Sequence, residues 1–423
     1  MKGEDRASGV LLPPTNNTCP QKVKARIKKH WTVPQKHRTP EQDEAEDYLI
    51  SFYIGKNRYW FVRGIKFSRW YLFFAAFLIQ FCIGSLYSWS VLNKPLDTLL
   101  YHNAKAEKSV NAFYTAVGVF GTTTAIMGPW IERNGPRAGV LLGASAFFTG
   151  YVIVAISLHS NWATGLYLGY GVVSAFGMGL CYISPVSALQ KWFPDYRYGA
   201  GSIVWGKAYL PIIDLVGLPS LFLVVGGIML CVLFCCAIVL RSPHHEFTAG
   251  GLNIHGEAIG EAEEASRRGE KFSVMSSHEY ESIAMVKKLT LIDAIKTIDF
   301  KFLYLMFFAN QLFGLIVLSK VSSMCVDLFG KTAAQGANIV SVNGAFNSIG
   351  RVMFPVISDA IIKYFKVEPA KGRKMIFWYA LVAQMIIVGT LPYGGGFGTI
   401  PCFLTDMFGA FNIGAMHGII LTS

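Results

Sequence analysis

The stretch Gly128-Pro-Trp-Ile-Glu-Arg-Asn-Gly-Pro-Arg137 separates two long apolar runs of the sequence. Glycine lets two helix ends approach closely, and a carboxylate beside two arginines can make and break charge-assisted bonds to a neighbouring helix end. We interpret the stretch as a hinge-like gating loop, and an ordinary turn with basic residues is the alternative. The gating residues are Gly128, Glu132, Arg133, Gly135 and Arg137.

The composition places the chain in a membrane. Hydrophobic residues make up 52% and charged residues 15% of the 423 residues, and the mean hydropathy is +0.40. A soluble surface needs roughly 25% charged residues, so most of this surface must meet apolar surroundings. The net charge of +12 could indicate nucleic acid, but the basic residues lie in tails and short loops rather than on one face. We therefore expect membrane lipid as a partner and no nucleic acid.

Apolar runs long enough to span a membrane outline the organisation, since a spanning helix needs about 20 mostly apolar residues. Such runs begin near Trp70, Ala112, Ala138, Thr164, Gly199 and Pro219, and again near Phe300, Ala337, Met375, Tyr393 and Ile419. The sequence predicts a largely disordered basic tail over residues 1–69, a six-helix half over 70–240, a linker over 241–299 and a partial second half over 300–423. The linker is polar, with one amphipathic helix expected near Ile292.

Loop charges predict the orientation, because translocated loops are poor in Lys and Arg. Lys and Arg are most frequent in three loops: those that end the second and fourth runs, and the one after the run at Ala337. We expect these loops, the N-terminal tail and the central linker to face the cytoplasm. The sequence does not identify which membrane holds the chain.

A weak internal repeat supports two related halves. Gly179, Pro185 and Trp192 recur as Gly395, Pro401 and Phe408, each shifted by the same number of residues. Glu132 at the end of the second run likewise corresponds to Asp359 at the end of the run at Ala337. We therefore add Asp359 to the gating residues.

The complete pattern G-x3-[DE]-R-x-G-x-R from Gly128 to Arg137 resembles the signature loop of the major facilitator superfamily. The resemblance implies an all-α membrane protein with two six-helix halves that alternately expose a central site. Three further stretches, Gly84–Leu96, Tyr182–Arg197 and Tyr393–Gly409, resemble the oxalate/formate antiporter group, which is related to the monocarboxylate transporters. The acidic-Gly-Gly-Trp-Gly-Trp motif of animal monocarboxylate transporters is absent from the first run, which favours the oxalate/formate group.

A carboxylate transporter needs a cation near the membrane midplane, because a carboxylate cannot lose its hydration in hydrocarbon without a charged partner. Arg351 lies in the run from Ala337 to Ile357, which is otherwise free of charge. The resemblance implies an arginine in the eighth helix that contacts the anionic substrate, and Arg351 falls there. The alternative is a structural arginine that bonds a carbonyl or extends toward the cytoplasm.

Aromatic and amide side chains would complete such a site, since a small anion needs shaped walls and few polar groups. The candidates for substrate binding are Arg351, Tyr87, Trp89, Tyr182, Gln80 and Gln311. Each aromatic candidate could instead anchor a helix at the membrane interface, where Trp and Tyr are enriched.

The second half has fewer residues than the predicted plan requires. Arg137 to Pro185 is 48 residues, whereas Lys374 to Pro401 is 27, too few for two full crossings at about 1.5 Å per residue. We expect a missing segment near Pro392, another after Arg197, and an incomplete C-terminal half beyond Ser423. A single crossing would place Asp406 on the external side.

The sequence contains no pattern typical of an enzyme or a cofactor site. The eight cysteines form no disulfide framework, and no Cys or His spacing fits a metal, so we expect no metal and no cofactor. No nucleophile, base and oxyanion donor converge.

These observations predict a secondary transporter of small carboxylates that works by alternating access, with a proton or a counter-anion as the coupled ion. Two alternatives stay open: a facilitator for another small solute, and a non-transporting membrane sensor or truncated isoform.

Overall fold

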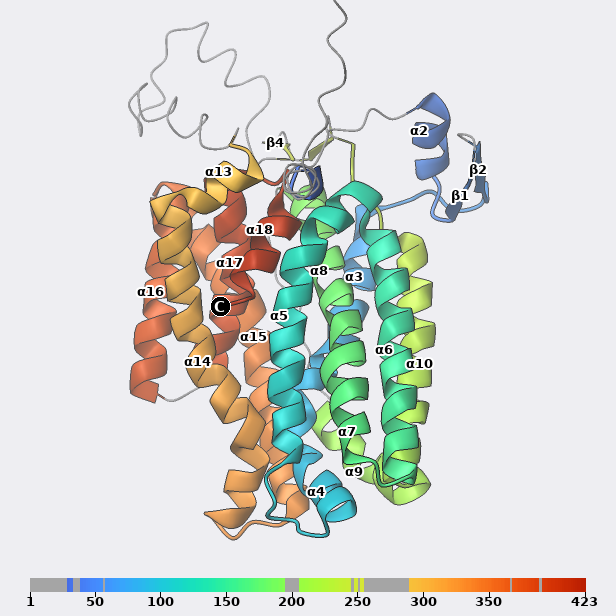
Figure 1. Cartoon of the computed structure of the whole chain (residues 1–423). Helices are drawn as coiled ribbons and strands as arrows, with labels where there is room; N and C mark the ends of the chain where they lie inside the picture. Colours follow the sequence, from blue (N-terminus) through green and yellow to red (C-terminus); the bar gives the residue numbers. More distant parts are fainter. Residues whose placement is uncertain are drawn as a thin grey trace, which may run out of the picture.

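The computed structural model is a bundle of long, roughly parallel helices (Figure 1). The structure describes residues 29–32, 39–55, 58–194, 205–244, 247–249, 252–254, 289–365, 367–387 and 390–423. Among these residues, seven helices are long and apolar enough to cross a membrane. They span Arg69–Val91, Ser109–Asn134, Pro136–His159, Ala163–Trp192, Leu218–Val239, Ile298–Asp327 and Ala333–Phe365.

The N-terminal half contains five of these spans and several shorter segments. α3 (Arg69–Ile83) continues into the 3-10 helix η1 (Gly84–Val91) and is followed by α4 (Asn93–Tyr101), α5 (Ser109–Asn134) and α6 (Pro136–His159). The next span joins α7 (Ala163–Leu166), the π-helix η2 (Tyr167–Ser174) and α8 (Ala175–Trp192). α9 (Trp205–Val216) and α10 (Leu218–Val239) complete this half, whose core is formed by apolar side chains such as Phe113, Phe147 and Phe222.

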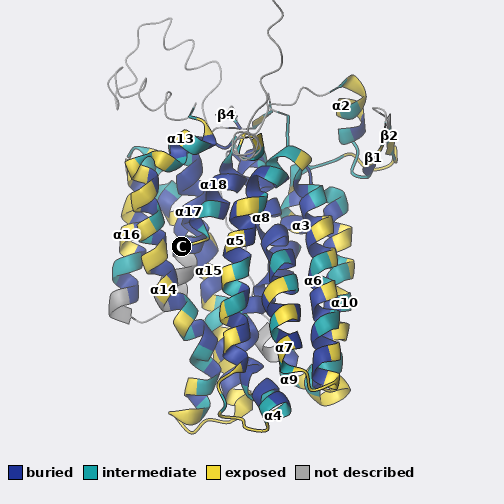
Figure 2. Cartoon of the chain, viewed as in Figure 1, coloured by how far each residue is buried: buried dark blue, intermediate teal, exposed yellow. Residues whose placement is uncertain are grey.

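The C-terminal half has its own core. α14 (Ile298–Asp327) and α15 (Ala333–Phe365) are followed by α16 (Pro369–Ile387), α17 (Thr390–Phe408) and α18 (Ile413–Ile420). A second apolar cluster that includes Phe307, Phe377 and Ile400 holds these helices together. Many apolar residues on the outward faces of the helices are exposed, as expected where a surface meets lipid (Figure 2).

The two ends of the bundle differ in what they carry. We call the end with the α5–α6 turn, α2 and α13 the linker end, and the end with α4 the opposite end (Figure 1). Gly135, at the α5–α6 turn, has φ of 88°, a conformation that favours glycine. The loops predicted to share one side of the membrane meet at the linker end, where the Trp192 indole N–H donates to the Arg241 carbonyl at 2.8 Å.

The prediction of a largely disordered tail over residues 1–69 is wrong for its second part. α2 (Pro40–Glu46) has Thr39 as its N-cap and Pro40 in its first turn, which are strong helix-start signals. β1 (Ser51–Gly55) and β2 (Arg58–Phe61) then form an antiparallel hairpin that is rich in aromatic residues, which favour strands. Residues 1–28 and 33–38 lie outside the described residues.

The linker has the amphipathic helix that the sequence predicts near Ile292. This is α13 (Leu291–Lys296), which is capped by Thr290 and buries Leu291 and Ala294. Two short strands, β3 (Thr248–Ala249) and β4 (Leu252–Asn253), pair near the start of the linker. Residues 255–288 lie outside the described residues.

The chain forms two helices instead of one crossing in this region, so the condition under which Asp406 would lie on the external side is not met. α16 and α17 are two separate helices of 19 residues each. Asp406, near the end of α17, pairs with Arg373, near the start of α16, so the chain returns to the end from which it came. Two helices of this length are each about 28 Å long at 1.5 Å per residue, which is close to the thickness of the bilayer core, and neither is among the seven most apolar spans. The expected gap after Arg197 lies outside the described residues.

Candidate functional site

Arg351 is buried between the two halves of the bundle. It lies in the middle of α15 and is only 5% exposed. Its Nε donates to the Asn347 amide oxygen at 2.9 Å, one helical turn earlier. Its Nη2 donates to the Tyr87 hydroxyl, on η1 of the N-terminal half, at 2.6 Å. A cation of the second half is therefore hydrogen-bonded to the first half.

Two aromatic rings flank the Arg351 guanidinium. Its Cζ lies 5.1 Å from the centroid of the Tyr87 ring and 4.5 Å from that of Phe397 on α17, within cation–π range. α17 approaches α15 closely because Gly398 packs against the Arg351 backbone, where a Cβ would clash. The rings and the adjacent helix thus fix the orientation of the guanidinium plane.

Tyr182 and His417 lie next to this cation. Tyr182 on α8 interacts with the Arg351 side chain, and its ring stacks on His417 of α18 with centroids 5.9 Å apart. Gln80 on α3 donates to the Tyr182 carbonyl at 3.1 Å, which fixes that turn of α8. The structure therefore brings Arg351, Tyr87, Tyr182 and Gln80 together, and their part in substrate binding stays a prediction.

The sequence analysis missed His417. Its side chain is fully buried, and within the described part of the chain neither ring nitrogen has a hydrogen-bonding partner. It is also close enough to Arg351 for the two side chains to interact electrostatically. A single polar residue in the otherwise apolar stretch Ile413–Ile420 is the signal that could have identified it.

The cluster combines one fixed cation, two phenol groups and an imidazole whose nitrogens are available. Guanidinium and N–H or O–H donors are the groups that recognise carboxylates and other small oxyanions. The contributing helices belong to both halves, so a bound anion would bridge them.

Two of the predicted substrate-binding residues have other surroundings. Trp89 lies in the core of the N-terminal half, where it stacks on Tyr170 with centroids 3.9 Å apart and donates to the Ser109 carbonyl at 3.3 Å. The structure does not bring Trp89 to the cluster, because its indole N–H and ring are used in this packing. Gln311 is buried on α14, beside Asn310, and its part in binding stays a prediction.

Glu132 in the gating loop connects the two halves at the linker end. It is almost completely buried and pairs with Lys191 of α8. Its Oε1 accepts hydrogen bonds from the Ser187 hydroxyl at 2.8 Å and from the Gly414 amide N–H at 2.9 Å. Gly414 is in the first turn of α18, so the carboxylate also meets the positive end of that helix.

The arginines of the gating loop make different contacts. Arg133 donates to the Pro129 carbonyl of its own helix at 3.1 Å and contacts His30 Nδ1 at 3.1 Å. Arg137 donates to the Ser51 carbonyl of β1 and, at 2.7 Å, to the Ile238 carbonyl of α10. Arg133 and Arg137 therefore contact three neighbouring segments: the one that contains His30, β1 and the end of α10.

Gly128 allows α5, the helix that ends in the gating loop, to touch α18. A Cβ at this position would lie 2.6 Å from the Ala415 Cα, and one at Gly121 would lie 2.5 Å from the Leu421 carbonyl oxygen. The Thr124 hydroxyl contacts the Gly418 carbonyl oxygen at 3.1 Å in the same interface. α5 and α18 are thus in backbone contact over two helical turns.

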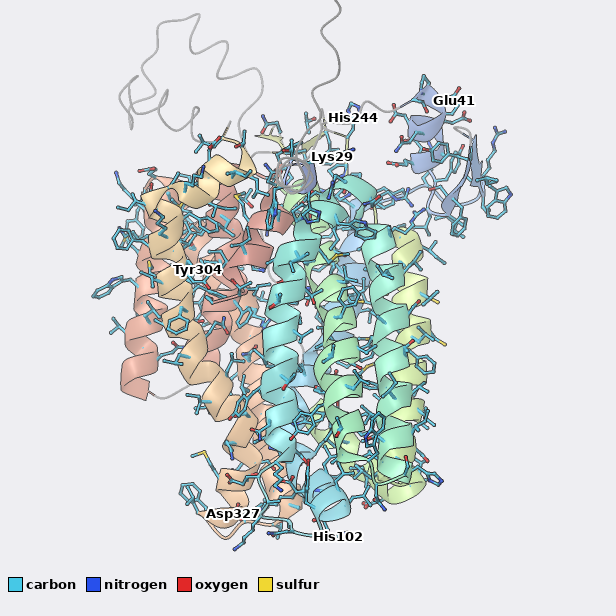
Figure 3. The ribbon with its side chains drawn as sticks, viewed as in Figure 1. Lys29, Glu41, His102, His244, Tyr304 and Asp327 are labelled. Carbon is cyan, nitrogen blue, oxygen red and sulfur yellow. The ribbon has the colours of Figure 1, made fainter. Side chains whose placement is uncertain are left out.

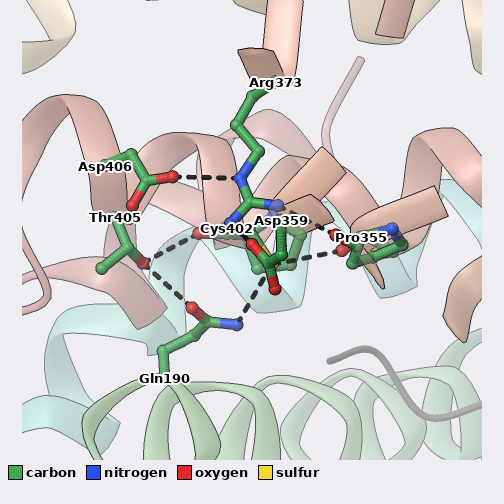
Figure 4. A network of polar contacts seen from close by, with 9 residues as sticks. Gln190, Pro355, Asp359, Arg373, Cys402, Thr405 and Asp406 are labelled. Carbon is green, nitrogen blue, oxygen red and sulfur yellow. Dashed lines mark hydrogen bonds and ion pairs between the residues drawn. The ribbon is translucent and has the colours of Figure 1, made fainter. Parts of the chain in front are cut away.

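Asp359 belongs to a second polar network at the linker end, within the C-terminal half (Figure 4). Arg373 pairs with Asp359 and, at 3.0 Å, with Asp406, and donates to the Pro355 carbonyl at 3.1 Å. This network meets the N-terminal half where Thr405 donates to the Gln190 amide oxygen at 3.2 Å.

The halves also touch at the opposite end. Lys94 pairs with Asp327 at 2.7 Å and Lys320 with Glu107 at 2.8 Å, and Figure 3 places Asp327 near His102 at this end. Asn93, a buried side chain of α4, donates to the Ser319 carbonyl at 3.0 Å. The Arg351 cluster is therefore enclosed between two sets of contacts. In the described part of the chain, no three His, Cys, Asp or Glu side chains could hold a metal ion together.

The chain is similar to known transporters. It is 22% identical to the uncharacterised MFS-type transporter YhjX of Escherichia coli K12, over 84% of each chain. It is also 22% identical to the oxalate:formate antiporter of Oxalobacter formigenes, over 82% of this chain and 79% of that one. The solved structure of the E. coli fucose:proton symporter FucP is similar with a TM-score of 0.45 and 12% identity, over 83% of this chain and 88% of that one. No protein-family model matches the chain.

These relatives confirm the predicted resemblance to the major facilitator superfamily and to its oxalate/formate antiporter group. The seven apolar helices of the structure agree with the predicted all-α membrane fold, and the incompleteness of the C-terminal half stays a prediction. The relatives are transporters, so a multi-pass membrane transporter is the function they indicate.

Proposed function

We propose that this chain, a relative of major facilitator transporters, carries small carboxylate anions through the membrane by alternating access. The observation that carries the proposal is the buried Arg351, which is bonded to Asn347 of its own helix and to Tyr87 of the other half. A charge in the membrane interior costs several kcal/mol and is retained mainly for function. The similarity to an oxalate:formate antiporter agrees with an anionic substrate.

The substrate carboxylate binds the guanidinium of Arg351, and the hydroxyls of Tyr87 and Tyr182 orient it. His417, with both ring nitrogens available among the described residues, donates a further hydrogen bond from α18. Gln80 keeps Tyr182 in place, and Gln311 lines the path between the halves.

Binding changes the balance between open and closed states because the anion neutralises a buried cation at the interface of the halves. A ligand shifts a conformational equilibrium only by its differential affinity for the two states. The enclosed arrangement gives the anion contacts from both halves at once, so the anion stabilises it. The gating residues Glu132, Arg133, Arg137 and Asp359 then determine which end opens. The linker end, where the basic loops gather, faces the cytoplasm in this proposal.

Uptake measurements on the purified chain in proteoliposomes test the proposal. We expect uptake of radiolabelled oxalate, formate or a monocarboxylate, driven by an opposing carboxylate gradient or by a proton gradient. Arg351→Ala abolishes this uptake, and Arg351→Lys lowers it at least about tenfold, because an ammonium cannot reproduce the planar two-point contact of a guanidinium. Lys331→Ala, which removes an exposed cation at the opposite end, serves as the matched control and leaves uptake unchanged.

Full carboxylate uptake by a correctly inserted Arg351→Ala protein would overturn the assignment. Transport that carboxylates do not inhibit would instead support a facilitator for another solute. Carboxylate binding without uptake by the unaltered chain would support the membrane-sensor alternative.

A further inference from the structure

A small folded module lies outside the bundle at the linker end. It consists of α2 and the hairpin of β1 and β2, which stands beside α6 and α10 (Figure 1). Its inner face is packed: Ala45 of α2 is fully buried, and Tyr48 stacks on Phe61 with ring centroids 5.0 Å apart. The second part of the tail is therefore a structured unit with a packed side.

The outer face of the hairpin is apolar and largely exposed, and at Phe52 it also meets the Arg137 guanidinium of α6, whose Cζ lies 5.8 Å from the ring centroid. Phe52 pairs with Trp60 across the strands, and their rings stack with centroids 6.0 Å apart. Ile54, which is unpaired at an irregularity of the register between Tyr53 and Gly55, and Val62, directly after β2, are exposed apolar residues beside this pair. Ile54 is 67% exposed and Trp60 is 52% exposed, which is unusual for such residues on a hairpin unless something apolar covers them.

Two arginines hold the module against the ends of two membrane spans. Arg137, in the first turn of α6, donates to the Ser51 carbonyl of β1 and to the Ile238 carbonyl of α10. Arg241, just after α10, donates to the carbonyls of Glu46, Tyr48 and Leu49 at 2.8, 2.9 and 2.7 Å. The module therefore has a fixed height relative to α6 and α10.

That height corresponds to the boundary of the lipid-facing surface. α10 is the most apolar span, and less than half of its apolar stretch is buried inside the protein. Exposed side chains such as Ile228 and Phe234 continue this surface toward Val239, where the helix ends. Aromatic residues are enriched at this level, where one end of a ring is in apolar and the other in polar surroundings.

The charges of the module are divided between its two elements. The sequence from Ser51 to Arg69 has five basic and no acidic residues, whereas Glu41 to Asp47 has five acidic and no basic residues. Figure 3 shows Glu41 on the side of the module farthest from the membrane spans. The basic and aromatic part thus lies nearer the lipid, and the acidic helix lies farther away. This is the arrangement that a negatively charged leaflet attracts.

We propose that the outer face of the hairpin, formed by Phe52, Ile54, Trp60 and Val62, inserts into the headgroup layer of an anionic leaflet and anchors the module there. The basic residues of the hairpin and of the following segment contact the lipid phosphates and carboxylates. Through Arg137 and Arg241 the anchor fixes α6 and α10 relative to the leaflet. This inference does not depend on which solute the protein carries.

Site-directed spin labelling of the full chain in nanodiscs tests the anchor. The label is attached to Ile54→Cys on the outer face, or to Glu44→Cys on α2 as the matched control, with Cys19, Cys231 and Cys235 replaced by Ser. The nanodiscs contain phosphatidylcholine and phosphatidylserine. Oxygen concentrates in the bilayer and a neutral nickel chelate concentrates in water, so the ratio of the two collision rates reports depth.

We expect the Ile54 label to collide mainly with oxygen and the Glu44 label mainly with the nickel chelate. Equal, water-like ratios at the two positions would overturn the proposal. An Ile54 label that neither reagent reaches would also overturn it, since protein would then cover the face. Replacing phosphatidylserine by phosphatidylcholine should lower the oxygen-to-nickel ratio at Ile54 severalfold, because each basic residue near an anionic surface contributes about 1 kcal/mol. An unchanged ratio would refute the role of anionic lipid.

Discussion

The two polar networks at the linker end occupy related positions in the two halves but connect different partners. Glu132 of the N-terminal half bonds Lys191 and Ser187 within its own half and the Gly414 amide of the other half. Arg373 of the C-terminal half pairs with two carboxylates of its own half, and this network meets the other half where Gln190 bonds Thr405 and Cys402. We propose that the Glu132 network is a gate, which opens and closes between the halves. The Arg373 network is a brace, which stabilises one half.

The difference follows from the charges that each network buries. In the N-terminal half one buried carboxylate has a surplus of donors, so it can accept the N–H groups at the start of α18. In the C-terminal half one buried guanidinium donates to two carboxylates and a carbonyl, so its N–H donors are used within its own half. The predictions below separate these two roles.

The largest effect on uptake is expected from a substitution where α5 touches α18. Gly128→Ala introduces a Cβ that would lie 2.6 Å from the Ala415 Cα, so the linker end cannot close fully. We expect uptake to fall to background, measured in proteoliposomes. Gly118→Ala is the matched control on the same helix, because a Cβ there meets nothing within 4 Å and alanine favours the helix by roughly 1 kcal/mol.

Similar transport by the Gly118→Ala and Gly128→Ala variants would show that the contact between α5 and α18 has no part in the transport cycle. Loss of protein from the membrane with Gly128→Ala would point to a folding defect. Size-exclusion chromatography in detergent therefore accompanies the uptake assay.

The next effect is expected for Glu132→Gln. The substitution leaves Lys191 buried without its carboxylate and weakens the bond to the Gly414 amide. Removing one partner of a buried pair costs about 3–5 kcal/mol. We expect a lower thermal midpoint in detergent and, in the membrane, a linker end that opens more easily.

Reaction of a Ser187→Cys variant with a water-soluble maleimide measures the opening at the linker end. Adding Glu132→Gln should increase the labelling rate, whereas adding Arg373→Lys should not. Equal labelling in both backgrounds would contradict the division into gate and brace.

Arg373→Lys is expected to have a smaller effect, limited to stability. A lysine cannot bridge Asp359, Asp406 and the Pro355 carbonyl at once, and a hydrogen bond to a charged group contributes roughly 1.5–3 kcal/mol. The thermal midpoint in detergent should fall, while the uptake rate of the folded fraction stays unchanged. A reduced uptake rate per folded molecule would show that the brace also takes part in gating.

The spans and the central cation could be predicted from the sequence because both are local signals. Length and hydropathy are sufficient to locate a spanning helix, and Arg351 was identifiable as the only charge in its run. The hairpin was missed because its two short strands have aromatic residues at consecutive positions, so the sequence shows no alternation of apolar and polar residues there. His417 was missed because the apolar run was expected to begin only after it, near Ile419.

Other features depend on packing that the sequence does not reveal. Tyr87 and Trp89 are two residues apart on the 3-10 helix η1, so they point to different sides, and only the packing of η1 shows which one faces Arg351. The return of α17 to the linker end depends on the pairing of Asp406 with Arg373, two residues 33 positions apart. The sequence pattern indicates both charges but not their contact.

The smallest effect on uptake is expected for Lys94→Ala at the opposite end. This variant extends the comparison, because the pair of Lys94 and Asp327 also joins the two halves. Lys94 and Asp327 have side chains that are 29% and 41% exposed, so water and salt screen the pair. Exposed pairs contribute only about 0–1 kcal/mol. We therefore expect a change in uptake of less than about fivefold at low salt, and none at high salt. Asn93→Ala is the contrasting variant, since Asn93 is buried and donates to the Ser319 carbonyl. If Lys94→Ala instead reduced uptake as strongly as Glu132→Gln, burial would not be what distinguishes a gating contact from an incidental one.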